Sequence, residues 1–202
     1  MLQQLLILAP PFLLAITFHE YAHGYVAWSL GDPTAQQQGR LTMNPLKHID
    51  PIGILAFIIM KIGWAKPVPI NPNYFKDPAR GMVWVSLAGP GANFTLALAS
   101  ALFLKLLMLA APMVPHTILY PLASMVVASV WINLLLGFFN LIPVPPLDGS
   151  KILYAFLPPK FAEAYEKLEP FGFFILLALF YLGIISKLIM PLINFSHKLM
   201  VG

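Results

Sequence analysis

Two histidines and a glutamate in an apolar N-terminal stretch are the residues best suited to chemistry in this sequence. His19, Glu20 and His23 form the pattern His-Glu-x-x-His within residues 17–24. On an α-helix, histidines four positions apart lie on one face about one turn from each other, so both imidazoles can share one zinc ion. The glutamate beside the first ligand can then act on a water bound to the metal. The pattern predicts a hydrolytic zinc site.

A third metal ligand is expected elsewhere in the chain, because zinc hydrolases usually hold the metal with three protein ligands and leave one position for water. The other polar motif beside an apolar stretch is residues 140–149, which end in Asp148-Gly149. Asp148 offers an oxygen ligand, and a site of two histidines and one aspartate would activate water rather than only brace the fold. The alternative is that Asp148 caps a helix starting at Ser150.

The composition indicates that membrane spans position these residues. The 202 residues are 59% hydrophobic and 10% charged, with a mean hydropathy of +0.79, whereas soluble domains carry about 25% charged residues. Ionisable groups are costly in lipid, so His19, Glu20 and His23 call for a functional explanation, the alternative being a polar cluster that ties helices together. The absence of cysteine excludes disulfides, thiolate zinc sites and cysteine nucleophiles. A net charge of +4 does not suggest a nucleic-acid partner.

Apolar stretches predict an all-α polytopic membrane protein, a bundle of about four transmembrane helices forming a single membrane-embedded domain over residues 1–202. A span needs about 20 residues, and the predicted spans are residues 4–30, 83–109, 118–142 and 171–193. Pro10 and Pro11 either open the first helix or kink it. Residues 36–72 are predicted to be a re-entrant, β-containing insertion, because residues 52–62 are apolar but too short to cross and residues 36–44 resemble a short extended element.

The basic residues predict the orientation in the membrane. They gather in the first and third connections between spans, whereas the second connection has no Lys or Arg; they are Arg40, Lys47, Lys61, Lys66, Lys76 and Arg80, then Lys151, Lys160 and Lys167. With four spans, the first and third connections share a side, which the positive-inside rule makes cytoplasmic. We therefore expect a multi-pass protein of the cell membrane with its active site toward the cytoplasm.

Taken together, the two polar motifs resemble those of the site-2 protease family of intramembrane zinc metalloproteases. His-Glu-x-x-His in a first apolar segment is followed by Asn-x-x-Pro-x-x-x-x-Asp-Gly after a later one. The resemblance covers residues 13–155 in the family's order. Between the motifs the chain is similar to the family's compact prokaryotic members at Gly39, Arg40, Leu41, Thr42, Asn44, Pro45, His48, Asp50, Pro51 and Gly53, at Lys66-Pro67-Val68 and at Ala88-Gly89-Pro90-x-x-Asn93.

The resemblance implies a role for each motif residue. It implies one zinc ion with three ligands, namely His19, His23 and Asp148. Glu20 would be the general base and acid, Asn140 would help to bind or polarise the substrate backbone, and Asn93 would assist. Residues 39–44 would form the family's membrane-associated β element, with an edge for an extended substrate. The regulatory PDZ or CBS domains of some relatives are not expected.

The predicted function is intramembrane zinc endopeptidase, acting in the lipid bilayer on single-span membrane protein substrates. A membrane metal transporter or metal-binding membrane protein is the alternative, but a transporter should show ionisable residues along a path across several helices. The later spans contain almost none beyond Lys105 and Lys187, which argues against transport. Asn93 and Asn140 could instead only hydrogen-bond between helices. His48 and Asp50 are interpreted as partners that fix a loop.

Overall fold

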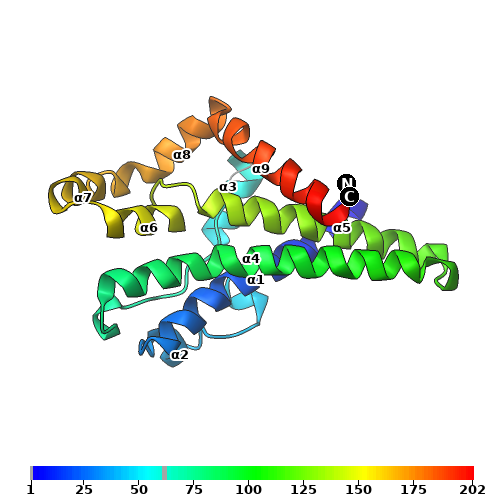
Figure 1. The fold of residues 1–202 in the computed structure, drawn as a ribbon, viewed down its shortest axis with the longest axis horizontal. Helices are drawn as coiled ribbons and strands as arrows, with labels where there is room; N and C mark the ends of the chain where they lie inside the picture. Colours follow the sequence, from blue (N-terminus) through cyan, green and yellow to red (C-terminus); the bar gives the residue numbers. More distant parts are fainter. Residues whose placement is uncertain (1, 61–62) are drawn as a thin grey trace.

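Four helices long and apolar enough to cross a membrane dominate the structure, a computed structural model that describes residues 2–60 and 63–202. They are α1 (Leu2–Ser29), α4 (Pro78–Leu109), α5 (His116–Asn140) and α9 (Ile184–Val201). Helices α1, α4 and α5 pack against one another, and α9 packs on α5 and α4 (Figure 1). The prediction of an all-α membrane bundle with about four transmembrane helices is confirmed.

Helix α1 runs through Pro10 and Pro11 without a break, so these prolines neither open the helix nor end it. The helix ends at Ser29, and Gly31 then has a φ of 106°, a backbone conformation that glycine adopts at little cost. At 1.5 Å per residue, His23 lies about 9 Å and His19 about 15 Å along the axis from the last residue of α1. The histidine pair therefore sits inside the helix, nearer to its C-terminal end.

Helices α4 and α5 run antiparallel and are joined by the short 3-10 helix η3 (Ala111–Met113). Helix α4 begins with two favourable signals, because the Asp77 side chain caps it by accepting from the Arg80 amide and Pro78 occupies its first position. Ala27 near the end of α1 packs with Val85 near the start of α4. The C-terminal ends of α1 and α5 thus meet the N-terminal half of α4.

The connection between α1 and α4 differs from the predicted insertion. It contains α2 (Thr34–Gln37), η1 (Pro45–Lys47), α3 (Pro51–Met60) and η2 (Pro72–Tyr74). The extended element predicted for residues 36–44 is not found: Gln36 and Gln37 belong to α2, and residues 38–44 form turns, bends and irregular backbone. Among the described residues, β pairing is limited to an isolated bridge between Ile49 and Ala65. The re-entrant path of residues 36–72 stays a prediction, and Lys61 and Ile62 lie outside the described residues.

The C-terminal part also departs from the prediction. After α5 come α6 (Asp148–Phe156), α7 (Pro159–Glu166), η4 (Glu169–Phe171) and α8 (Gly172–Tyr181). The stretch 171–193 is not one span, because Gly183 adopts a left-handed φ of 70° and separates α8 from α9. The fourth long helix is therefore Ile184–Val201, and α8 and α9 form an inverted V above the bundle in Figure 1.

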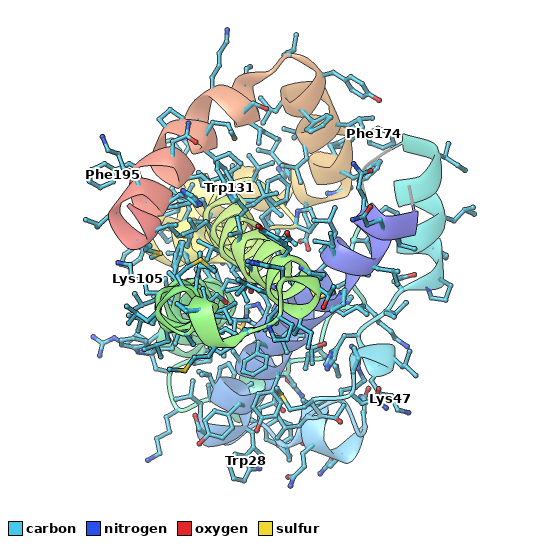
Figure 2. The ribbon with its side chains drawn as sticks, turned by 90° about the vertical axis from the view of Figure 1, so that its right-hand side faces the viewer. Trp28, Lys47, Lys105, Trp131, Phe174 and Phe195 are labelled. Atoms are coloured by element: carbon cyan, nitrogen blue, oxygen red, sulfur yellow. The ribbon has the colours of Figure 1, made fainter. Side chains whose placement is uncertain are left out.

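The hydrophobic core lies where α4, α5 and α9 meet. Small residues on α4, Ala97 and Ala101, allow the close approach of helices that membrane packing requires. Three isoleucines of α9 complete this core, namely Ile185, Ile189 and Ile193. Trp131 of α5 packs against His197 of α9 with ring centroids 4.9 Å apart and the rings tilted by 32°, while Phe195 points outward (Figure 2). The fourth helix is thus fixed to the bundle by one face only.

Candidate metal centre

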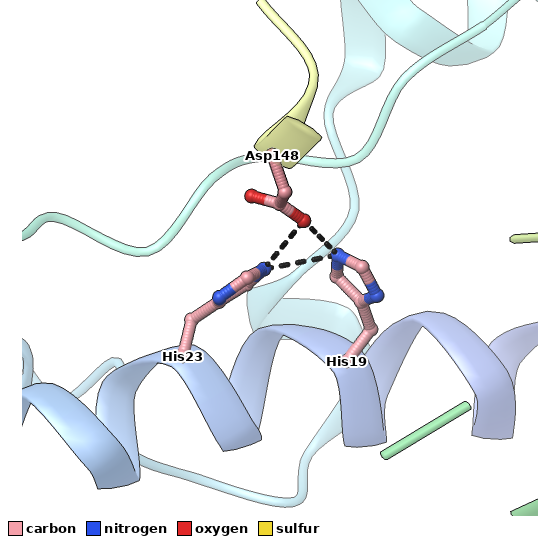
Figure 3. Close-up of side chains that lie close together, drawn as sticks. All are labelled: His19, His23 and Asp148. Atoms are coloured by element: carbon pink, nitrogen blue, oxygen red, sulfur yellow. Dashed lines mark hydrogen bonds and ion pairs between the residues drawn. The ribbon is translucent and has the colours of Figure 1, made fainter. Parts of the chain in front are cut away.

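Three side chains from distant parts of the chain meet in one buried cluster. The Nε2 atoms of His19 and His23 are 3.0 Å apart, and Oδ2 of Asp148 lies 3.2 and 3.1 Å from them, respectively (Figure 3). All three residues are less than 9% exposed. Among the described residues, this is the group of histidines and carboxylates arranged so that it could hold a metal ion.

Local structure explains how the three ligand atoms converge. His19 and His23 occupy successive turns of α1, and their rings meet nearly edge to face at an interplanar angle of 82°. Asp148 is the first residue of α6, so its side chain projects from the start of that helix toward α1 (Figure 3). The next residue must be small, because a Cβ on Gly149 would overlap the backbone carbonyl groups of Leu141 and Ile142. Tight packing of this turn places the Asp148 side chain next to the two histidines.

Gly89 of α4 leaves room for the ring nitrogens of His19 and His23. A Cβ added to Gly89 would lie 2.6 Å from Nε2 of His19 and closer still to Nε2 of His23. The backbone of α4 therefore packs directly against the ligand atoms. Access by a larger molecule from the α4 side is excluded by this contact.

Hydrogen bonds determine which nitrogen of each imidazole carries the proton. Nδ1 of His23 donates to the Val85 carbonyl at 2.6 Å, and a carbonyl can only accept. Nδ1 of His19 is 2.6 Å from Oδ1 of Asn93, whose orientation is set because its amide nitrogen donates to the Ala15 carbonyl at 3.2 Å. Both Nδ1 atoms are therefore donors, and both Nε2 atoms present lone pairs toward Asp148.

This convergence fits a bound cation. Asp148 is only 6% exposed, and its Oδ2 lies within 3.2 Å of both Nε2 atoms. Two imidazole lone pairs and a carboxylate oxygen then face one another, and Oδ2 of Asp148 is buried without a hydrogen-bond donor. Zinc bonds of about 2.0–2.1 Å place tetrahedral ligand atoms roughly 3.3–3.4 Å apart, close to the observed separations. The donor set and its spacing fit zinc.

A buried polar chain supports His19 from behind. The amide nitrogen of Asn93 donates to Oδ1 of Asn133 at 2.9 Å, and the amide nitrogen of Asn133 donates to the Ser129 carbonyl at 2.9 Å. The Ser129 hydroxyl lies 2.8 Å from that of Ser100. Both asparagines are 0% exposed. This chain links α1, α4 and α5 through hydrogen bonds that end at a candidate metal ligand.

The remaining predicted site residues lie outside the three-residue cluster. Asn93 has its oxygen engaged by His19 and its nitrogen by protein acceptors, so it is placed behind the ligand rather than on a substrate surface. Asn140, at the last position of α5, is half-buried and donates to the Leu136 carbonyl at 3.0 Å. Glu20 is half-buried and accepts from the Val68 amide at 2.9 Å. Its carboxylate is thus held by the connection between α1 and α4.

Two groups that the sequence did not indicate also belong to the site. The Val85 carbonyl has no side-chain signature, so no motif could have pointed to it. Asn133 sits in a long apolar stretch, where a lone amide is a recognisable signal for a polar contact between helices. A second asparagine seven positions before Asn140 was therefore a detectable but unspecific clue.

Comparison with known proteins gives consistent matches. The family model "Peptidase family M50" matches residues 106–179, which include Asp148. "Putative zinc metalloprotease YwhC" of Bacillus subtilis is 39% identical over 184 residues, covering 90% of this chain and 83% of that protein. "Putative zinc metalloprotease Rip2" of Mycolicibacterium smegmatis is 31% identical over 175 residues, and that of Mycobacterium tuberculosis 30% over 174; the chain spans 64% of each. No solved structure matches the chain.

Proposed function

The chain belongs to peptidase family M50 and is a zinc metalloprotease of the membrane, and we propose that it cleaves peptide bonds in or near transmembrane helices of membrane-anchored substrates. The observation that carries this proposal is the buried convergence of His19, His23 and Asp148 inside a bundle of apolar helices. A peptidase whose candidate metal ligands lie along a membrane span is positioned to act on peptide bonds at membrane depth.

In the proposed site, His19, His23 and Asp148 hold one zinc ion. Zinc supplies a Lewis acid that polarises a carbonyl and lowers the pKa of water to about 7. The protein's contribution is orientation: Asn93 and the Val85 carbonyl keep both Nδ1 atoms protonated, so each Nε2 offers a lone pair. Three protein ligands leave a fourth position for water, as in catalytic rather than structural zinc sites.

Glu20 is the proposed general base and acid. It lies next to the ligand His19 on the same turn of α1, and its carboxylate can take a proton from water and pass it to the leaving amine. One carboxylate oxygen accepts from the Val68 amide, so the other oxygen is the one assigned to proton transfer. Positioned proton transfer of this kind contributes roughly 100- to 10,000-fold to rate.

The proposed substrates are single-span membrane proteins. A transmembrane helix hides its carbonyls in hydrogen bonds, so the segment to be cleaved must unwind locally before water can attack it. Asn140, half-buried at the end of α5, is the residue proposed to hydrogen-bond the unwound backbone. The M50 relatives' names state the class of protease but no substrate.

We also propose that the site faces the cytoplasm. The connection between α1 and α4 carries four described basic residues, with Arg80 in the first turn of α4, and the connection after α5 carries three more, whereas residues 110–115 carry none. These two basic connections lie at the end of the bundle toward which His23 and Asp148 are placed. The positive-inside rule assigns that end to the cytoplasm.

Zinc analysis combined with cleavage of single-span peptides reconstituted in vesicles tests this function. Glu20→Gln should keep about one zinc per chain and lose cleavage by at least 100-fold, because the amide cannot accept the proton. Asp148→Ala should lose both zinc and cleavage. Full cleavage by Glu20→Gln would refute the proposed base, and unchanged zinc affinity in Asp148→Ala would refute the ligand set.

A further inference from the structure

The extended segment 66–71, here called the strap, passes along α1 beside the candidate base. We propose that the backbone amide of Val68 positions the Glu20 carboxylate, and that Arg40 and His48 act as positioning residues by holding the strap in place. This inference rests on the proposed role of Glu20 in catalysis. It also gives a function to two sequence motifs, residues 39–50 and 66–68, that the metal ligands do not explain.

The central contact is a single hydrogen bond between the strap and α1. The Val68 amide donates to Oε2 of Glu20 at 2.9 Å. The Val68 side chain is only 6% exposed and packs over Gly24, where an added Cβ would lie 3.2 Å from its Cγ1. Because the side chain is anchored against the same helix as Glu20, the amide has little freedom to turn away.

Proline spacing makes this donor specific. Pro67 and Pro69 have no backbone N–H, so Val68 carries the lone amide donor between them. Proline also favours an extended backbone for the residue before it, which suits a segment that lies along a helix. The sequence Pro-Val-Pro thus presents one isolated donor to the carboxylate.

Both ends of the strap are fastened to the protein. At its start, the Lys66 amide donates to the His48 carbonyl at 2.9 Å, and Nη2 of Arg40 donates to the Lys66 carbonyl at 2.8 Å. At its end, the Asn71 amide donates to Oδ2 of Asp32 at 2.7 Å. These anchors lie on both sides of Val68.

The anchoring residues are themselves buried and oriented. His48 is 0% exposed, and its Nε2 donates to the Thr42 carbonyl at 2.8 Å. Arg40 is 8% exposed, so its guanidinium is committed to the interior of the connection rather than to solvent. Burying a guanidinium and an imidazole is costly unless they are paired. Each has one hydrogen bond, from Nη2 of Arg40 to the strap and from Nε2 of His48 to Thr42, whereas Nε of Arg40 and Nδ1 of His48 are buried without a partner.

The consequence is that one oxygen of Glu20 is occupied and the carboxylate plane is restricted. A base whose rotamer is held beside the reacting atoms loses less activity to misorientation, and displacements of about 1 Å can cost roughly 100-fold in rate. The strap therefore supplies orientation to Glu20 in the way that Asn93 and Val85 supply it to the two histidines.

A pair of substitutions at one position tests the contact. Val68→Pro removes the N–H and keeps an apolar side chain, whereas Val68→Ala keeps the N–H and removes two methyl groups. With the single-span peptide that the wild type cleaves fastest in vesicles, Val68→Pro should lower kcat roughly 10- to 100-fold with KM and zinc content unchanged. Val68→Ala should stay within about threefold of wild type. Equal kcat in Val68→Pro and Val68→Ala would overturn the inference.

A double-mutant cycle tests the role of Arg40. Arg40→Ala should lower kcat by itself, and Arg40→Lys should recover part of the loss because a donor to the Lys66 carbonyl is restored. If Arg40 acts through the strap, adding Arg40→Ala to Val68→Pro should produce little further loss. Fully additive losses would show that Arg40 acts by another route.

Amide hydrogen exchange tests the contact without substrate. In protein labelled with ¹⁵N-valine and ¹⁵N-lysine, Glu20→Ala should speed exchange of the Val68 amide by at least about 10-fold, while the Lys66 amide stays protected by the His48 carbonyl. Unchanged exchange at Val68 would overturn the inference. Full cleavage by Glu20→Gln would instead refute the proposed base while leaving the exchange result intact, so the two failures are distinguishable.

Discussion

Substitution of Gly89 by alanine is the most direct test of where the candidate metal ligands lie. The added Cβ would be 2.6 Å from Nε2 of His19 and nearer to Nε2 of His23, whereas observed Cβ contacts are essentially never shorter than 3.0 Å. Helix α4 cannot easily retreat, because its Val85 carbonyl, one turn earlier, accepts from Nδ1 of His23. The imidazoles must therefore move.

The required displacement sets the expected magnitude. Restoring a 3.0 Å contact moves His19 by at least 0.4 Å, about twice the tolerance of roughly 0.2 Å on metal–ligand distances. Loss of supporting contacts around a metal site typically costs 10- to 100-fold in affinity, so displacement of two ligands should cost on the order of 100-fold or more. At about 1.4 kcal/mol per tenfold change, this is roughly 2.8 kcal/mol or more of zinc-binding free energy.

Gly91→Ala is the matched control. It lies two residues further along the same helix, and an added Cβ there meets no atom within 4 Å. Replacing glycine by alanine inside a helix should be neutral or stabilise by up to about 1 kcal/mol. The assay is zinc affinity by competition with a chelator on purified protein in detergent, with helix content checked by circular dichroism.

The zinc affinities of the two variants should therefore differ. Gly89→Ala should keep the helical fold and lose zinc, whereas Gly91→Ala should keep both. Wild-type zinc affinity in Gly89→Ala would refute the placement of the ligand atoms against α4. Equal zinc loss in both variants would show that the effect comes from α4 as a whole and not from the contact with His19 and His23.

Two further predictions concern the buried polar chain behind His19 and the break between α8 and α9 at Gly183. Asn93→Ala should lower zinc affinity roughly 10- to 100-fold, because His19 loses the acceptor for Nδ1. Asn133→Ala should keep zinc affinity within a few fold and lower the free energy of unfolding by about 1–3 kcal/mol, because the Asn93 amide loses a partner. Chelator competition and chemical unfolding measure the two effects, and identical zinc loss in both variants would contradict the separation. Gly183→Ala should destabilise the protein by about 1 kcal/mol, because alanine is strained at a left-handed φ of 70°. No neighbour lies within 4 Å of an added Cβ, so the backbone conformation alone causes this effect. A neutral result in thermal unfolding would show that the backbone there relaxes.

The candidate metal ligands were predictable because their chemistry is visible in residue type. His19 and His23 needed only helical spacing, and Asp148 needed only the requirement for a third ligand near the same membrane end. The structure brings these three together across about 125 residues of sequence. The long apolar stretches likewise predicted three of the four long helices closely, because length and hydropathy alone identify spans.

Departures from the prediction arise where a local backbone preference overrides composition. Residues 171–193 are apolar apart from Ser186 and Lys187, yet Gly183 adopts a left-handed conformation that divides them. In residues 36–44 no strand forms: Gln36 and Gln37 end the short helix α2, which follows a turn in which Asp32 accepts from the Thr34 amide. Hydropathy averages over such single-residue events, so neither break was visible in the apolar pattern.

The motif Ala88-Gly89-Pro90-x-x-Asn93 shows how a sequence signal can be correct in position and incomplete in meaning. Asn93 was interpreted as a possible aid to substrate binding, but its oxygen faces His19 and its nitrogen faces Ala15 and Asn133. Gly89 has no side chain, yet this absence determines how closely α4 approaches the ligand atoms. Both residues contact the candidate ligands on the α4 side. A motif without a ligand can therefore belong to a metal site through orientation and close packing, and these roles depend on contacts between helices that sequence spacing alone does not define.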